Sequence, residues 1–463
     1  MDIFVDPTNG SDLATGTQSR PFRTLLRAID SQRNGDRIIL EDGLHSADVP
    51  IEVREIIQGQ IRARNRGRAQ LRVNTMAGVG GSVTLTDCEK YTLDGIVFQP
   101  PVDLLSPNGL AFQPSDISIL RIDGGNGNLV QNADFDNWVI EGTKANWIVS
   151  AVSSTGCNAF RMKAVRINRI EVNYAISESP DFIPGGYVYG VHIGNTGTCS
   201  ISDVRVHEVI GHNAGVCGIM TGVEDPDSTT DVVRIQRCYI EDVKTAATAE
   251  FDDNDNVTNS EGLDFAWGIG VMGIENGTDI VIDDTQVVRA IATHQNPDID
   301  AGLTAGYAFL GARNTRLRHV LAYYTDIGIS AQLVGTQSRW ENVTVHRAQQ
   351  GLVLCPYTAS PIRVVARNVS LSEMDVGIVT YGPGTPSEAG SPGGGPAFLD
   401  IDFLNIYQVK DLVSVPGAAS PATHFQRGRH FTTKNPRFVD PSDEGHDFRL
   451  EYVSPLINAG GEV

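Results

Sequence analysis

A motif that recurs every 22 to 26 residues constrains the fold of this chain more than any other sequence feature. Between residues 300 and 385 a glycine opens a short apolar strand, a polar turn follows, and a His or Asn leads a second strand. The opening glycines are Gly306, Gly328, Gly351 and Gly377, and the second strands are led by His319, Asn342 and Asn368. Both series keep the same step, which predicts stacked coils of strand and turn, a β-solenoid.

The motif continues upstream with less regular spacing. Further glycines open apolar strands at Gly190, Gly218 and Gly268. Longer gaps between these strands predict loops inserted on the solenoid. Because stacked strands lie about 4.8 Å apart, we predict that Asn342 and Asn368 share one axial column, with His319 beside them.

Bulk properties exclude several classes of protein. No apolar stretch approaches the roughly 20 residues that cross a bilayer, so no transmembrane segment is expected. The formal net charge of −20 disfavours nucleic acid and anionic membranes as partners, because both bind basic surfaces. The six cysteines lack metal-ligand spacing, and we interpret them as small buried side chains. No secretory signal is visible after Met1.

The start of the chain predicts a short helix. Phe22, Leu25, Leu26 and Ile29 have the i, i+3, i+4, i+7 spacing of an amphipathic helix, and Pro21 suits its first turn. Such a helix would cover the open end of a solenoid, where the first coil has no neighbour.

Both ends of the chain carry a family resemblance. It rests on residues 4–29, on residues 35–43, and on residues 435–441, 447–450 and 454–460. These segments resemble the cap, the first coil and the closing segment of the pectate-lyase-like right-handed parallel β-helix superfamily. That superfamily includes polysaccharide lyases, glycoside hydrolases and phage tailspike-like proteins, so the resemblance implies a fold and leaves the activity open.

The predicted fold class is therefore all-β, a single-stranded right-handed parallel β-helix with a short N-terminal capping helix. We expect the cap over residues 1–35, coils with inserted loops over residues 36–430, and the closing segment over residues 431–463. A site has to be found on the coils, because the fold alone specifies no chemistry.

Strand parity predicts an uncharged row on one face of the solenoid. Residues two places after each opening glycine are expected to point outward. They are His192, Met220, Gly270, Ala308, Ser330, Val353 and Val379. We interpret His192 as an isolated polar surface residue and the rest as a contact surface, packed under a loop or against a second subunit. The row favours a homo-oligomer, for which a trimer is one candidate.

The second strands present a charged face in the first half of the chain. The side chains predicted to face outward there are Asp134, Asp136, Glu171, Arg205, His207, Tyr239 and Glu241. If their strands occupy successive coils, these side chains follow one another at about 5 Å. They are our catalytic candidates, and charge for solubility alone is the alternative. A register slip of one residue would turn the whole cluster over.

Such a cluster suits two kinds of carbohydrate chemistry. Two carboxylates that flank a glycosidic bond act as acid and nucleophile, or as acid and base, depending on their separation. Asp134 or Asp136 with Glu171 would supply that pair. β-Elimination of a uronic acid instead needs a base and a cation, roles that Arg205, His207 and Tyr239 would share.

Two further charged segments have both a functional and a plain interpretation. The acidic residues Glu250, Asp252, Asp253 and Asp255 are a candidate calcium site, although they lack the spacing of an EF-hand and also suit a solvated loop. The arginines at 54, 62, 64, 66, 68 and 72 suit an anionic polymer or an ion-pair surface equally well. No cofactor is required by any motif, and calcium is the only candidate.

These features predict a polysaccharide-binding depolymerase, either a glycoside hydrolase or a lyase. The expected partner is a glycan, and the expected location is extracellular or on a virion surface, where the protein would be tailspike-like. The alternative is a non-catalytic virion fibre or decoration protein built on the same β-helix.

Overall fold

The structure is a computed structural model of the chain. It describes residues 1–73, 80–100, 117–143, 148–174, 186–194, 197–212, 214–222, 232–247, 265–272, 279–294, 304–333, 337–356, 360–381, 396–416, 425–442, 447–451, 454 and 456. The chain forms two compact units. Unit 1 comprises Met1–Thr230, Asp242–Ala266 and Ala292–Gly302, and unit 2 comprises Asp231–Glu241, Trp267–Ile291 and Leu303–Val463.

Unit 1 contains the helix α1 (Leu25–Ser31) and a run of short strands. They are β1 Asp2–Val5, β2 Arg37–Leu40, β3 Gly43–Ala47, β4 Ile51–Arg54, β5 Gln60–Ala63, β6 Ala69–Val73, β7 Gly80–Thr86, β8 Thr92–Asp94, β9 Ile96–Gln99, β10 Ile117–Asp123, β11 Leu129–Gln131, β12 Asp134–Phe135, β13 Trp138–Thr143, β14 Ile148–Thr155, β15 Phe160–Lys163, β16 Arg166–Tyr174, β17 Gly186–Gly194, β18 Thr198–Ser202, β19 Arg205–His212 and β20 Ala214–Gly222.

The remaining strands are longer on average. They are β21 Val232–Gln236, β22 Tyr239–Ala247, β23 Ala266–Met272, β24 Asp279–His294, β25 Thr304–Ala312, β26 Asn314–Leu333, β27 Ser338–Pro356, β28 Ile362–Thr380, β29 Ala397–Ser414, β30 Phe425–Arg427, β31 Phe431–Thr432, β32 Phe438–Asp440 and β33 Asp447–Leu450.

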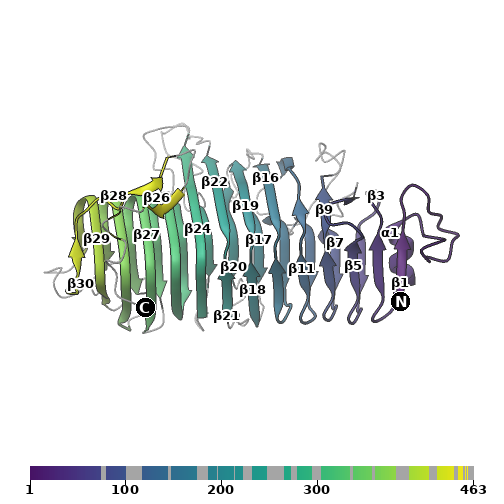
Figure 1. Cartoon of the computed structure of the whole chain (residues 1–463), viewed down its shortest axis with the longest axis horizontal. Coiled ribbons are helices and arrows are strands. Elements are labelled where there is room, and N and C mark those ends of the chain that lie inside the picture. The colour runs from purple at the N-terminus through teal and green to yellow at the C-terminus, as the bar shows by residue number, and fades with distance from the viewer. Residues whose placement is uncertain are drawn as a thin grey trace, which may run out of the picture. The chain divides into compact units, whose positions relative to one another are not determined.

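In unit 1, each strand pairs in parallel with the corresponding strand of the next coil, and the purple-to-teal strands lie side by side (Figure 1). One register column links Val83, Leu120, Val152, Val191 and Ile219 through five successive coils. All five side chains are at most 2% exposed. Because each fully buried aliphatic side chain contributes about 1.5–3 kcal/mol, such inward columns are the main source of stability.

In unit 2, the strands β26 to β29 also pair in parallel, one coil after another. Gly328, Gly351 and Gly377 stack as predicted. A Cβ added to Gly328 or Gly351 would lie 2.6 or 2.5 Å from the carbonyl oxygen of the glycine in the next coil. This position requires glycine because the backbones approach too closely for a side chain.

The polar leaders of the second strands mark a sharp corner. Asn342 and Asn368 both have left-handed φ values, 54° and 55°, and the Asn368 side-chain amide donates to Asn342 Oδ1 at 2.9 Å. His319 in the neighbouring coil has φ 52°. The residues on either side of His319 pair with the residues on either side of Asn342, so the two corners are adjacent. The predicted axial column is therefore confirmed. Asparagine tolerates this conformation because its short polar side chain bonds locally.

The capping helix α1 begins at Leu25, after the N-cap residue Thr24, whose hydroxyl accepts the Arg27 N–H at 3.3 Å. Such a cap contributes about 1 kcal/mol. Pro21 precedes the helix instead of occupying its first turn, because Thr24 is the better N-cap. Leu25 and Ala28 are the buried helical residues, which directs this face toward the first strands.

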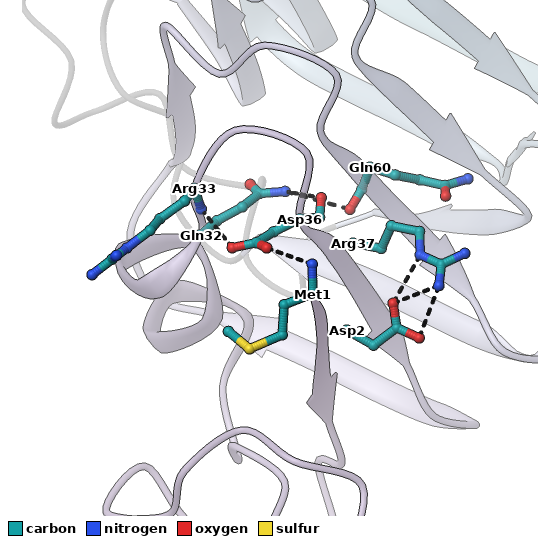
Figure 2. Close-up of polar contacts among 7 residues, drawn as sticks. All are labelled: Met1, Asp2, Gln32, Arg33, Asp36, Arg37 and Gln60. Atoms are coloured by element: carbon teal, nitrogen blue, oxygen red, sulfur yellow. Dashed lines mark hydrogen bonds and ion pairs between the residues drawn. The ribbon is translucent and has the colours of Figure 1, made fainter.

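A polar network lies at this end of unit 1 (Figure 2). The Asp36 carboxylate binds the α-ammonium of Met1 at 2.7 Å and accepts the Arg33 N–H at 3.0 Å. Burial acts to raise the pKa of Asp36, but these hydrogen bonds outweigh it and the pKa is lowered. The buried Gln32 accepts a hydrogen bond from the Tyr91 hydroxyl at 2.8 Å. The network satisfies polar groups at the end of the core.

The predicted all-β right-handed parallel β-helix with a short N-terminal helix is confirmed by these ladders. All six cysteines are buried and unbonded to one another, as expected. Among the described residues, no helix is long and apolar enough to cross a membrane.

The uncharged outward row is buried except at Ser330, which is half-buried, and the burial of His192 corrects its interpretation as a surface residue. In unit 1, His192 is 4% exposed and Met220 is 2% exposed. In unit 2, Ala308, Val353 and Val379 join Ile327 and other residues in an apolar cluster. The row is already covered in a single chain, so it is not an open contact surface for a second subunit.

Candidate functional site

The charged face of unit 1 follows one register column. Asp134 in β12 pairs with Arg166 in β16, and Arg166 pairs with Arg205 in β19. The alternate residues Phe135 and Ile167 are fully buried, so the three charged side chains point away from the core. Three successive coils therefore present acid, guanidinium and guanidinium at intervals of about 4.8 Å.

Glu171 does not lie in this column, which corrects our predicted alignment of the coils. It pairs with Val139 and Ile210, five residues further along β16 than Arg166. Both stretches of β16 alternate apolar and polar residues, so parity alone does not distinguish them. The position that we assigned to Glu171 belongs to Arg166.

The corner before Arg166 explains the error. Ala164 has φ 52°, the left-handed conformation that Asn132 and Asp203 adopt at the corresponding corners, with φ 53° and 55°. An asparagine or aspartate in a sequence indicates that such a corner is favourable, whereas an alanine gives no such indication. The spacing of two residues from the corner, shared by Asp134, Arg166 and Arg205, is the signal that would have found Arg166.

Asp134 lies in β12 and Asp136 directly follows it, one on each side of the buried Phe135 along the chain. Asp136 accepts a hydrogen bond from Gln99 Nε2 at 3.1 Å and one from the Asn137 N–H at 3.0 Å. The Asp134 carboxylate makes no hydrogen bond or ion pair with any residue that the structure describes. The pair thus contains one anchored and one unengaged carboxylate.

The two arginines of the column are exposed, and neither is ion-paired within the described part of the chain. Arg166 and Arg205 face each other across one ladder step, so their positive charges reinforce each other. The chain as a whole has a net charge of −20, but Arg166 and Arg205 make a small basic patch next to the acidic Asp134. His207, two residues after Arg205, is half-buried and also points outward.

Glu171 belongs to a second polar group on the neighbouring part of β16 and β19. Its carboxylate binds the Arg169 guanidinium and lies 3.3 Å from His212 Nε2. Arg169 Nε also lies 3.5 Å from Glu208 Oε2. Glu171 is therefore engaged by a cation and an imidazole and is only 15% exposed at its side chain. This arrangement suits an ion-pair network better than a free general acid.

Tyr239 and Glu241 lie in unit 2, where Glu241 binds Arg289 with a nitrogen–oxygen distance of 2.9 Å. Both side chains are half-buried. The salt bridge occupies the Glu241 carboxylate.

The proposed calcium residues Glu250, Asp252, Asp253 and Asp255 lie outside the described residues. Within the described residues, no group of three or more His, Cys, Asp or Glu side chains is arranged to hold a metal.

The arginine-rich coils near the N-terminus have mixed engagements. Arg54 binds Glu52 at 2.7 Å, and Arg64 binds Glu41 at 2.5 Å. Arg72 in β6 pairs in register with Gln99 in β9 of the next coil. Part of this segment is thus an intramolecular ion-pair surface, in line with the plainer of the two interpretations.

Comparison with protein-family models finds no match, and no curated protein matches the sequence. Several solved structures resemble the chain at low identity. The catalytic domain of a GH87 α-1,3-glucanase is 14% identical over 92% of this chain and 68% of its own, with a TM-score of 0.41. A rhamnogalacturonan lyase is 11% identical over 98% and 95%, with a TM-score of 0.42. Pectate lyase Pel9A is 12% identical over 100% and 92%, with a TM-score of 0.41. At these values the likeness carries no information about the function of this chain.

Proposed function

We propose that this protein is a carbohydrate-active enzyme that depolymerises a polysaccharide on the charged face of unit 1. The observation that carries the proposal is the pair of outward carboxylates, Asp134 and Asp136, beside the guanidinium groups of Arg166 and Arg205, which form no ion pair with the described residues. Two carboxylates that flank a glycosidic bond are the pair that inverting glycoside hydrolases use as general acid and general base.

The roles of the two carboxylates follow from their surroundings. Asp136, which accepts two N–H hydrogen bonds, is the general base that removes a proton from the attacking water. Asp134 is the general acid that protonates the departing glycosidic oxygen. Water then forms the new bond to the anomeric carbon as the bond to the leaving sugar breaks, so the configuration inverts.

A second reaction is favoured by the adjacent arginines. In β-elimination from a uronate, Arg166 and Arg205 would neutralise the sugar carboxylate and His207 would remove the C5 proton. The C4–O bond then breaks, the departing sugar oxygen takes up a proton from solvent, and the remaining sugar is left with a C4–C5 double bond. Both reactions use a glycan as the partner, and they differ in the product.

We further propose an extracellular or virion-surface location, with a tailspike-like role in binding and shortening a glycan. The alternative is a non-catalytic virion fibre or decoration protein, for which the charged face serves solubility. The expected homo-oligomer stays a prediction, which a mass measurement in solution by light scattering tests.

A polysaccharide panel tests the proposal. Neutral and uronate-containing polymers are incubated with the protein, and reducing ends and the absorbance of unsaturated uronic products are followed. Reducing ends without that absorbance indicate hydrolysis, and both signals together indicate elimination. If no polymer in a broad panel is shortened, the non-catalytic alternative is favoured.

Variants then locate the chemistry. Asp134→Asn should slow cleavage by roughly 100- to 10,000-fold, because it removes a general acid. Glu171→Gln is the matched control, since it changes a neighbouring carboxylate that is engaged by Arg169. If Glu171→Gln lost this much cleavage rate and Asp134→Asn did not, the catalytic site would instead lie at Glu171 and His212.

A further inference from the structure

Unit 2 contains a pocket that the sequence patterns did not indicate. It has a volume of about 290 Å³ and lies between the strands β27 to β29 and the C-terminal segment. Its floor comes from successive coils, because His346 pairs with Ser372 and Ser372 pairs with Tyr407. Glu373 follows Ser372 and completes the floor. We call this cavity the closing pocket.

The roof of the closing pocket is the segment from Asn435 to Phe438, with Pro441 and Glu451. It is held in place by the antiparallel pair β32 and β33 and by the Glu451 N–H, which donates to the Arg437 carbonyl at 2.8 Å. The Phe438 ring packs edge-on against His346, with centroids 5.4 Å apart. Figure 1 shows the yellow C-terminal strands close to the green strands of this unit. The pocket is therefore built by tertiary contacts on both sides.

Three side chains in the pocket keep their hydrogen-bonding capacity. The Tyr407 hydroxyl, the Arg437 guanidinium and the Glu451 carboxylate make no hydrogen bond or ion pair with any described residue. The Oδ1 atom of Asn435 accepts a hydrogen bond from the Arg437 backbone N–H at 2.8 Å. Its side-chain NH2 group makes no hydrogen bond with the described residues and can donate to a ligand. Donors and acceptors thus face the same small space.

The charges of the pocket balance. Glu373 binds Arg347 at 3.0 Å and is neutralised by it. Glu451 and Arg437 contribute one charge of each sign. The lining thus has two carboxylates and one guanidinium, and Arg347 outside the lining neutralises one of the carboxylates, so a neutral ligand is favoured. Aromatic rings of Tyr407 and Phe438 add an apolar surface.

We propose that the closing pocket binds a single neutral sugar residue. A sugar ring donates and accepts hydrogen bonds around its edge and has an apolar face, which matches this mixture of groups. The volume is at the lower end of ligand pockets, about 300–1,000 Å³, and suits one ring. The choice of a sugar rests on the proposed glycan-directed function, but the pocket itself shares no residue with the charged face of unit 1.

Saturation-transfer NMR on the full chain tests the proposal with defined probes. The probes are methyl glycosides of glucose, galactose, mannose, rhamnose and N-acetylglucosamine at millimolar concentration. At least one should receive saturation from the protein. Tyr407→Ala and Glu451→Gln should weaken its affinity by roughly 3- to 10-fold each, as expected for the loss of a hydrogen bond. Tyr324→Ala is the control, because Tyr324 is 46% exposed and lies outside the pocket.

Three outcomes would overturn the proposal. They are saturation of none of the glycosides, binding by both pocket variants that equals binding by the unchanged protein, and saturation confined to glycine or acetate run as separate arms. Asp134→Asn should bind the probe as the unchanged protein does, because it alters only the charged face. Cleavage without pocket binding would reject this inference alone, and pocket binding without cleavage would reject the proposed enzyme alone.

Discussion

The strand that follows the left-handed corner meets different environments in the two units. In unit 1, the fourth residue after the corner is Asp136 or His207, and both are half-buried. In unit 2, the fourth residue after the corner is Tyr323 or His346, and these are 0% and 2% exposed. Both sets point away from the solenoid core. Outward direction is therefore not the same property as exposure.

The difference comes from what lies over the strand. His346 stacks on Tyr323 with centroids 5.7 Å apart and is covered by Phe438 from the closing segment. Its Nδ1 lies 2.8 Å from the Ser372 hydroxyl. A second, smaller core has thus formed on the outside of the coils. A solenoid face is therefore available as a site where no segment lies over it, and it becomes a packing surface where a segment covers it.

Removing the cover is the largest expected effect. Phe438→Ala should destabilise unit 2 by about 3 kcal/mol, because it removes a buried aromatic ring and leaves a cavity over His346. Urea unfolding measures the loss, and hydrogen exchange of β27 and β28 should accelerate. Val439→Ala is the control, since Val439 is 48% exposed and should change stability by less than about 0.5 kcal/mol. Equal stability of the two variants would contradict the packing role of Phe438.

A smaller effect compares two serines at outward positions. Ser372 is fully buried and bonds to His346, so Ser372→Ala should cost about 1 kcal/mol. Ser46 is exposed on β3 in unit 1, and Ser46→Ala should stay within about 0.5 kcal/mol. Urea midpoints measured side by side sharpen the comparison. A larger loss from Ser46→Ala would mean that unit 1 is covered as well.

The smallest expected effect is a change in pH dependence. Burial lowers the pKa of His346, against the opposing effect of Glu373, which raises it. Between that lowered value and the ordinary value of about 6.5, the unfolded chain binds a proton that the folded chain does not. Stability of unit 2 should therefore be full above about pH 6.5 and should fall as the pH drops below it.

His346→Gln should reduce the acid-side slope of this dependence, measured as the urea midpoint at several pH values between 7.5 and 5, a range of about two and a half units. His207→Gln is the control, because His207 is the fourth residue after the corresponding corner of unit 1 and is only half-buried. An unchanged slope in His346→Gln, or an equal change in both variants, would show that cover does not control this titration.

Much of the fold was predictable from short stretches of sequence. The recurrence of Gly328, Gly351 and Gly377 reports a backbone contact that recurs once per coil, so the pattern is visible without any structure. Asn342 and Asn368 likewise announce a left-handed corner through their residue type. The helix at the N-terminus followed from its apolar spacing, although its first residue did not.

The candidate site was predictable only in part. Asp134, Asp136, Arg205 and His207 point outward as their alternation with apolar residues indicates. The predicted alignment of Glu171 was wrong because a left-handed corner lies at Ala164, and alanine is not a residue type that indicates such a corner. Without a recognisable corner, the sequence does not show where the strand begins or how it pairs with the next coil. Arg166 was missed for the same reason.

The sequence by itself determined the parity of each strand, the coil repeat and the all-β class, because these depend on residues close together in the chain. Only the tertiary structure decided which outward side chains are covered and which strands are neighbours. Phe438 lies far along the chain from His346, and the coils of unit 1 vary in length, as the steps from Asn132 to Ala164 and to Asp203 illustrate. Contacts of this range depend on how the whole chain packs, and no local pattern encodes them.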